Sequence, residues 1–349
     1  MRLSSSPLLL PFFLISFSFT SALVAAQALP VDSVWQMKDG ATNGGCDANG
    51  RKDILNAWQS ESWDLASNAY NYISQYSSDK FVRKACSTLF GLKSKNRVST
   101  YPKKEEDLDE ITLVFLRLQT YFGTTSGGKK AGLFCGTDWL KLVERGVDAI
   151  ARDFMGNEIW IKDKPQTIKD VYNEDILINQ VPFWSEDLTS YEFSVEEDFC
   201  SDDPTAKAAT SGLQIFRPAA TSGDRELNYG VSLCPFAFDD KDALDTLPPV
   251  PAGGNAVVLV GADGKQFGKG TSLTTTLPKS ATLFHEAMHV LYGVKFLSDK
   301  EKYSLTECIN TKWSAPMKRT NPENYVFFAL AMWYRQHGFD FSTGKLLAI

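Results

Sequence analysis

The chain has 349 residues, 22% of them charged, and a formal net charge of -6 at pH 7. This length is enough for a large hydrophobic core in one domain or two. The acidic balance and the lack of any basic run argue against a nucleic-acid-binding protein, which needs clustered Lys and Arg to neutralise phosphates. No apolar segment after residue 28 is long enough to cross a bilayer, so we expect no membrane partner.

Residues 1–28 have the pattern of a secretory signal peptide. Arg2 supplies a positive charge, residues 7–19 are almost entirely apolar, and residues 22–28 provide small side chains for cleavage. The alternative is a membrane anchor, but the apolar run is short and is interrupted by Pro11 and several Ser. We therefore expect a secreted, extracellular protein.

All cysteines follow this segment, and their number is even. An even count in an exported chain predicts that every cysteine is paired, here in three disulfides, although sequence alone does not choose the pairing. No Cys-x-x-Cys spacing is present, so a zinc site built from cysteines is not expected. The positions are Cys46, Cys86, Cys135, Cys200, Cys234 and Cys308.

Helical periodicity comes first along the chain. Apolar residues recur at three- and four-residue steps in four stretches that we predict to be helices: residues 52–77, 79–92, 107–121 and 138–154. After residue 154 the spacing of apolar residues becomes shorter, as in strands. Predicted strands follow at residues 158–161, 214–216, 229–238 and 256–260, whereas residues 168–172 and 181–199 fit either structure. Helical spacing returns at residues 280–293, 306–317 and 322–336.

This order of helices, then strands, then helices favours an α+β fold over alternating βαβ units. We predict a helical lobe over residues 29–154. A second lobe, over residues 155–349, would contain an antiparallel or mixed sheet and the remaining helices.

The motif His285-Glu286-x-x-His289 lies within residues 280–293. Residues four apart share one face of a helix, so the two imidazoles can bind one metal ion and Glu286 can reach a water on that metal. Ser280 is a suitable N-cap and Gly293 a suitable C-terminal stop. The alternative is a pair of core histidines, but a buried Glu beside them would be costly without a metal. We therefore predict a Zn²⁺ site on this helix.

A catalytic zinc usually takes three protein ligands and one water. The remaining histidine, His337, lies far along the chain in another predicted helix. The third ligand should therefore be a carboxylate, and the candidates are Asp299, Glu301 and Glu307.

Four features of the last third of the chain resemble one known family. They are the Cys-Pro at the end of residues 231–236, the motif helix at residues 281–289, the position of Asp299, and the Asn-Pro-Glu-Asn-Tyr segment at residues 321–325. On these residues the chain resembles the deuterolysin and fungal lysine-specific metalloendopeptidases, which are zincins with an Asp as third ligand. The resemblance implies a zincin-like second lobe and Asp299 as the ligand.

The resemblance also implies further site residues. Tyr303 would donate a hydrogen bond to the developing oxyanion, and Glu323 would receive the side chain of a substrate lysine. The match is imperfect, because Asp299 and Tyr303 are four residues apart instead of three and Val326 replaces the second acid of the lysine site. Glu307 stays open as the alternative ligand, since thermolysin-like zincins take a Glu from the next helix.

These observations predict a secreted, monomeric zinc-dependent endopeptidase. Glu286 would act as general base on a zinc-activated water, and the partner would be a protein or peptide substrate. The alternative is a secreted zinc-binding or cell-surface protein of the same fold without proteolysis. The presence of Glu286 favours the enzyme, because zinc binding alone does not need that carboxylate. The weak match around Asp299 favours the alternative.

Overall fold

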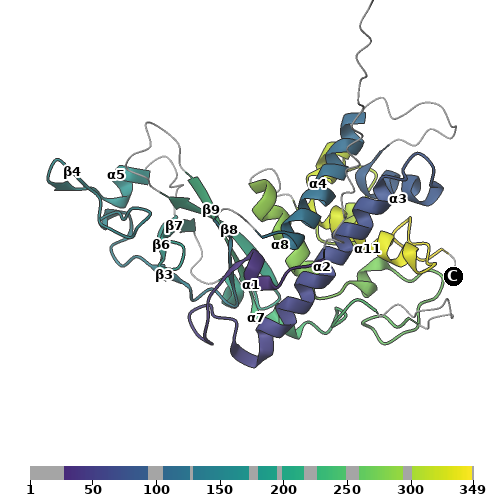
Figure 1. Cartoon of the computed structure of the whole chain (residues 1–349), viewed down its shortest axis with the longest axis horizontal. Coiled ribbons are helices and arrows are strands. Elements are labelled where there is room, and N and C mark those ends of the chain that lie inside the picture. Colours follow the sequence, from purple (N-terminus) through teal and green to yellow (C-terminus); the bar gives the residue numbers. More distant parts are fainter. Residues whose placement is uncertain are drawn as a thin grey trace, which may run out of the picture.

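The computed structural model describes residues 27–92, 105–125, 129–172, 180–194, 199–215, 226–248, 259–293 and 301–347. Within these ranges the protein is α+β, as the order of elements predicts. A sheet occupies one side of the molecule and most helices the other (Figure 1). Residues 1–26 of the predicted signal peptide and most of the predicted strand at residues 256–260 lie outside the described residues.

Three long helices form the amino-terminal part of the helical side and confirm the first three predicted helices. They are α2 (Arg51–Ile73), α3 (Lys80–Phe90) and α4 (Glu105–Gly123). The carboxylate of Asp79 caps α3 by accepting hydrogen bonds from two backbone N–H groups, and Gly91 ends it with a left-handed φ of 69°. A short helix, α1 (Val31–Val34), precedes them.

The sheet is mixed and has seven strands in the order β1-β2-β9-β8-β7-β6-β3. Neighbours β1, β2 and β9 are parallel, and the pairs from β9 through β8, β7 and β6 to β3 are antiparallel. The long central pair is β8–β9, in register from Ala208↔Leu233 to Ile215↔Glu226. The strands are β1 (Gln36–Met37), β2 (Gly132–Phe134), β3 (Leu140–Leu142), β6 (Val181–Ser185), β7 (Ser190–Ser194), β8 (Ala208–Ile215) and β9 (Glu226–Leu233).

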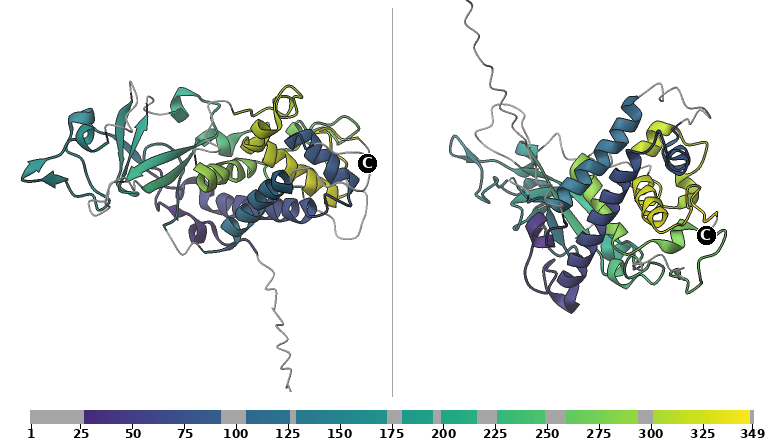
Figure 2. Two further views of the ribbon diagram at one scale, coloured as in Figure 1. Left: turned by 90° about the horizontal axis from the view of Figure 1, so that it is seen from above. Right: turned by 45° about the vertical axis from the view of Figure 1, so that its right-hand side comes forward.

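A separate hairpin, β4 (Trp160–Ile161) with β5 (Lys164–Pro165), projects from the sheet side, away from the helices (Figures 1 and 2). The short helix α5 (Ile168–Tyr172) follows it, which settles one of the two ambiguous stretches. The other, residues 181–199, contains the β6–β7 hairpin.

The largest buried cluster joins the amino-terminal helices to two carboxyl-terminal ones, α8 (Ala281–Tyr292) and α11 (Pro322–Gln336). In it Phe115 and Phe328 pack against Phe90 and Tyr325, with Phe115 meeting Tyr325 edge-on and the other ring pairs tilted. Each such ring contributes about 1.5–3 kcal/mol by leaving water. The cluster draws residues from both sides of position 154, while a smaller one surrounds Trp184 on the sheet side. The lobe division at residue 154 stays a prediction.

Two predicted helices are wrong. Residues 138–154 form β3 and a single 3₁₀ turn at Gly146–Asp148, because residues 140–142 pair with β6 and Trp139 packs on the sheet against Phe134. Residues 306–317 hold two short helices, α9 (Leu305–Cys308) and α10 (Ala315–Arg319). Pro316 explains the break, since proline favours the first turn of a helix and disrupts an interior.

The predicted strand at residues 229–238 also needs correction. β9 ends at Leu233, and Pro235 starts a short helix, α7 (Pro235–Asp239). Proline lacks the N–H that a strand would donate but fits the start of a helix.

The expectation of three disulfides is wrong, because the structure contains two. Cys46 pairs with Cys135, and Cys200, in α6 (Phe199–Asp202), pairs with Cys234. Cys86 and Cys308 are free thiols buried among the helices, where a cysteine packs as a small apolar side chain. Two disulfides are compatible with an oxidising compartment. Among the described helices, none has the length and apolar character that a membrane span requires.

Candidate metal centre

Helix α8 confirms the predicted motif helix and lies between β8 and the other helices (Figures 1 and 2). Phe284 and Met288 are fully buried and fix one side of it in the core. Gly293 ends the helix with a φ of 51°, and the Tyr229 hydroxyl stands where a Cβ at this position would lie.

Ser280 precedes α8 but is not the predicted side-chain cap. Its hydroxyl makes no bond to the first turn and donates instead to Glu61 Oε2 of α2, at 2.6 Å. The second oxygen of Glu61 accepts from the backbone N–H of Leu247, at 2.9 Å. The start of the motif helix is therefore fixed by the neighbouring helix.

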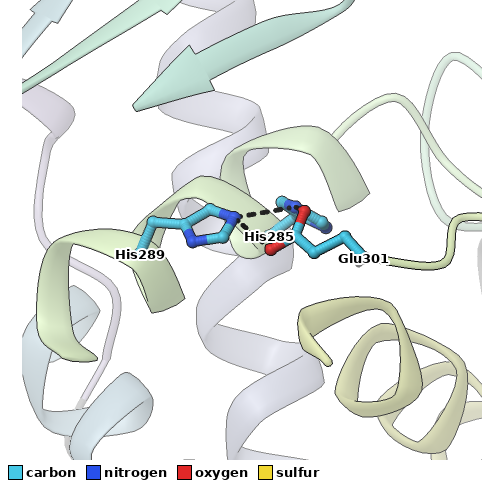
Figure 3. Close-up of side chains that lie close together, drawn as sticks. All are labelled: His285, His289 and Glu301. Atoms are coloured by element: carbon cyan, nitrogen blue, oxygen red, sulfur yellow. Dashed lines mark hydrogen bonds and ion pairs between the residues drawn. The ribbon is translucent and has the colours of Figure 1, made fainter. Parts of the chain in front are cut away.

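The two histidines of the motif point to the same place, and Glu301 joins them there from an irregular segment (Figure 3). The Nε2 atoms of His285 and His289 lie 3.1 Å apart. Glu301 Oε1 lies 3.2 Å from His289 Nε2, and Oε2 lies 3.7 Å from His285 Nε2. Ligands about 2.0–2.2 Å from a tetrahedral zinc are roughly 3.3–3.5 Å apart, so these separations suit a single ion.

Polar atoms in this cluster lack the hydrogen bonds that burial normally demands. Within the described residues, His289 Nδ1 and Glu301 Oε1 are buried without a hydrogen-bond partner, although Oε1 lies close to His289 Nε2. Leaving such groups unpaired costs about 1–3 kcal/mol each. A cation between the three side chains would give the Glu301 oxygen a partner, so the residues present fit a metal ion.

Neighbouring side chains orient the cluster. Glu323, in the first turn of α11, accepts at 3.0 Å from Nδ1 of His285, which leaves Nε2 of that ring facing the cluster. The Tyr303 hydroxyl donates to Glu301 Oε2 at 2.7 Å, and its ring stacks on His285 with centroids 5.8 Å apart. Buried metal sites commonly hold their histidines through such carboxylate contacts.

Glu286 faces β8. The Thr210 hydroxyl donates to Glu286 Oε2 at 2.6 Å. Burial raises the pKa of Glu286, an effect that the neighbouring His285 and this hydrogen bond partly offset. A carboxyl with a raised pKa is better suited to accept and return a proton near neutral pH.

The two imidazoles differ in their affinity for a proton. Burial alone would lower the pKa of His285, but the nearby carboxylates of Glu301 and Glu323 outweigh it and raise this pKa to about 10. Burial, and then the charge of His285, lower the pKa of His289 to about 4. Without a metal the cluster therefore holds its proton on His285, and a bound cation would replace that proton.

The structure brings together His285, Glu286 and His289 as the motif predicts. It adds Glu301, which was one of three candidate carboxylates. Asp299, the ligand that the resemblance implies, lies outside the described residues. Glu307 is exposed and outside the cluster: its carboxylate accepts from Ser304 at 2.8 Å and pairs with Lys302 at 3.4 Å.

Two residues play parts that the sequence did not indicate. Glu323 bonds with His285, whereas the resemblance implies contact with a substrate lysine. Thr210 reaches Glu286 from a strand 76 residues earlier in the chain, and no local pattern marks that contact.

Comparisons of the chain with models of known families, with curated proteins and with solved structures found no match. The geometry of this centre therefore carries the functional argument.

Proposed function

We propose that this chain is a secreted zinc-dependent endopeptidase with a zincin-like catalytic centre. The observation that carries the proposal is the convergence of His285, His289 and Glu301 on one point, with the carboxylate of Glu286 on the same helix. Histidine nitrogen and carboxylate oxygen in this ratio are the ligand set of catalytic zinc in His₂Glu proteases. The two disulfides support secretion.

The chain would hold the ion through His285 Nε2, His289 Nε2 and the Glu301 carboxylate. The zinc supplies a Lewis acid that lowers the pKa of a bound water and polarises a carbonyl. Glu286 accepts a proton from the attacking water and returns it to the leaving amine. Thr210 holds Oε2 of Glu286, which fixes the direction of the carboxylate.

Tyr303 stands beside the centre. Its side chain is 64% exposed and its hydroxyl bonds with Glu301. By exchanging this bond it would donate to the oxyanion that develops on the substrate carbonyl. Because Glu323 bonds with His285, we do not extend the proposal to a preference for lysine.

A second candidate is a zinc-binding protein without proteolysis. One observation favours it: His285, Glu286 and His289 are only 5–7% exposed, which restricts the approach of a peptide. A hydrolase must admit its substrate to the metal, whereas a structural zinc site is closed.

Hydrolysis of a denatured protein, measured together with zinc content, separates the two functions. We expect hydrolysis by the zinc-loaded chain, its loss with a chelator and its return with added zinc. Glu286→Gln should lower the rate by about 10²–10⁴-fold while zinc stays bound, because the variant loses the base and keeps the ligands. Glu144→Gln, at an exposed position just after β3, is the matched control. Tight zinc binding with no hydrolysis by the unmutated chain would establish the second candidate instead.

A further inference from the structure

Asn321 stands at the N-cap of α11, immediately before Pro322. An Asn at this position usually accepts a hydrogen bond from the first turn of its helix. Here the side chain makes no such bond. The residue is 2% exposed, and its amide points toward the backbone of Lys302.

The amide of Asn321 binds Lys302 at two points. Oδ1 accepts from the backbone N–H of Lys302 at 2.9 Å, and Nδ2 donates to the carbonyl of the same residue at 2.9 Å. Nδ2 also donates to Asn324 Oδ1 at 2.7 Å. A two-point contact fixes the orientation of the Lys302 backbone as well as its position, as a neighbouring strand would.

Lys302 lies between Glu301 and Tyr303, the two residues that this segment brings to the metal centre. Residues 301–303 belong to no helix or strand, so no regular backbone ladder holds them. Asn324 anchors the contact in the core by donating to the carbonyls of Leu89 and Cys308, at 2.6 and 3.1 Å.

We propose that Asn321 is a positioning residue of the metal centre: by holding both backbone groups of Lys302 it places the Glu301 carboxylate against His285 and His289. The start of α11 would then align two parts of the site, because Glu323, two residues further on, holds the ring of His285. This inference rests on the proposed function only in requiring that the site binds zinc.

The test measures zinc affinity of the full chain by competition with a chromophoric chelator, and the visible spectrum of the Co²⁺-substituted protein. We expect Asn321→Ala to weaken zinc binding by about 10–100-fold, the usual effect of removing a residue that orients a ligand. Asn321→Asp is a second, isosteric variant: it keeps the acceptor for Lys302 N–H but loses both donors. It should also weaken zinc binding and change the Co²⁺ spectrum.

Gln59→Ala is the matched control. Gln59 is another buried amide with bonds of the same kind, accepting from Trp35 Nε1 at 3.1 Å and donating to the Phe122 carbonyl at 3.1 Å. Its loss should lower the stability of the metal-free chain and leave zinc affinity within a factor of about two, since no ligand depends on it.

The outcomes separate the inference from the function. Folded Asn321 variants that bind zinc as tightly as the unmutated chain, with an unchanged Co²⁺ spectrum, would overturn the inference alone. If Asn321→Ala does not fold, Asn321→Asp decides. Zinc binding with no proteolysis would overturn the proposed function and leave the inference intact, and a chain that binds no zinc would overturn both.

Discussion

The two carboxylate oxygens of Glu301 have the contacts expected of a metal ligand. One oxygen accepts from Tyr303, and the other faces His289 without a hydrogen bond. The pKa of Glu301 is lowered, because the nearby His285 outweighs the effect of burial. The side chain is thus held in its ionised form, which is the form that binds a cation.

Substituting the three candidate carboxylates one at a time identifies the third ligand. We expect Glu301→Gln to weaken zinc binding by at least 100-fold, because a neutral amide replaces a charged ligand atom. Asp299→Asn and Glu307→Gln should leave the zinc affinity nearly unchanged. Isothermal titration at fixed pH measures all three. A large loss in Asp299→Asn with none in Glu301→Gln would assign the site to the residue that the family resemblance implies.

The sequence predicts the two histidines and the base because one helical turn brings them together, whatever the rest of the fold does. It does not choose the carboxylate. Glu301 lies outside α8, in the irregular segment of residues 301–303, so no helical period relates it to His289. The contact with His289 depends on Tyr303, a neighbour in the same segment, and on Asn321, which reaches Lys302 from 19 residues further along the chain.

Helices α2 and α8 are joined through a partly buried carboxyl. Glu61 accepts from Ser280, at the start of α8, and from Leu247. Burial raises the pKa of Glu61, and these two hydrogen bonds only partly offset it. The charged form is therefore less favourable in the folded chain than in the unfolded one.

This shift gives a pH dependence with a definite sign. Because the pKa of Glu61 is higher in the folded state, its contribution to stability is complete below the unfolded pKa and is lost as pH rises through the folded pKa. Glu61→Gln lacks this titration. We expect the free energy of unfolding of the unmutated chain to fall, relative to this variant, between pH 4 and pH 7. Urea denaturation of both proteins at the two pH values measures it, with Glu144→Gln as the control. A constant difference would contradict the expectation.

Other elements show where sequence patterns succeed and fail. The helices α2, α3, α8 and α11 follow from uninterrupted apolar periods, and their ends from Asp79, Gly91 and Gly293. Residues 138–154 carry a similar period yet form β3, because pairing with β6 and the packing of Trp139 on Gly230 outweigh local preference. Long-range pairing of this kind leaves no signature in a single stretch of chain.

At the scale of the molecule, the candidate metal centre lies where the sheet side and the helical side meet. Thr210 of β8 reaches Glu286 from the sheet side, whereas Glu323 of α11 reaches His285 from the helical side. Residues from widely separated parts of the chain thus complete one helix motif. The packing of α11 against α2, α3 and α8 brings Glu323 into place, and the packing of α8 against β8 brings in Thr210.

The pattern of disulfides reflects the same division. The bond Cys46–Cys135 ties a loop to the end of β2, and Cys200–Cys234 ties the short helix α6 to the end of β9, at sequence separations of 89 and 34 residues. In the chain-entropy account, closing loops of this size lowers the entropy of the unfolded chain and stabilises the folded state by roughly 4–5 kcal/mol for each disulfide. The helical side instead relies on its packed core, and its two cysteines remain thiols inside it.

Counting thiols tests this arrangement. We expect a thiol reagent to label two cysteines, Cys86 and Cys308, in the unreduced and denatured chain. In the folded chain labelling should be slow, because burial raises the pKa of both thiols well above the usual value and little reactive thiolate forms. Mass spectrometry of the labelled peptides identifies the sites. The double variant Cys86→Ala/Cys308→Ala should show no labelling and keep both disulfides. If the unmutated chain shows no thiol even when denatured, it contains the third disulfide that an even cysteine count suggests.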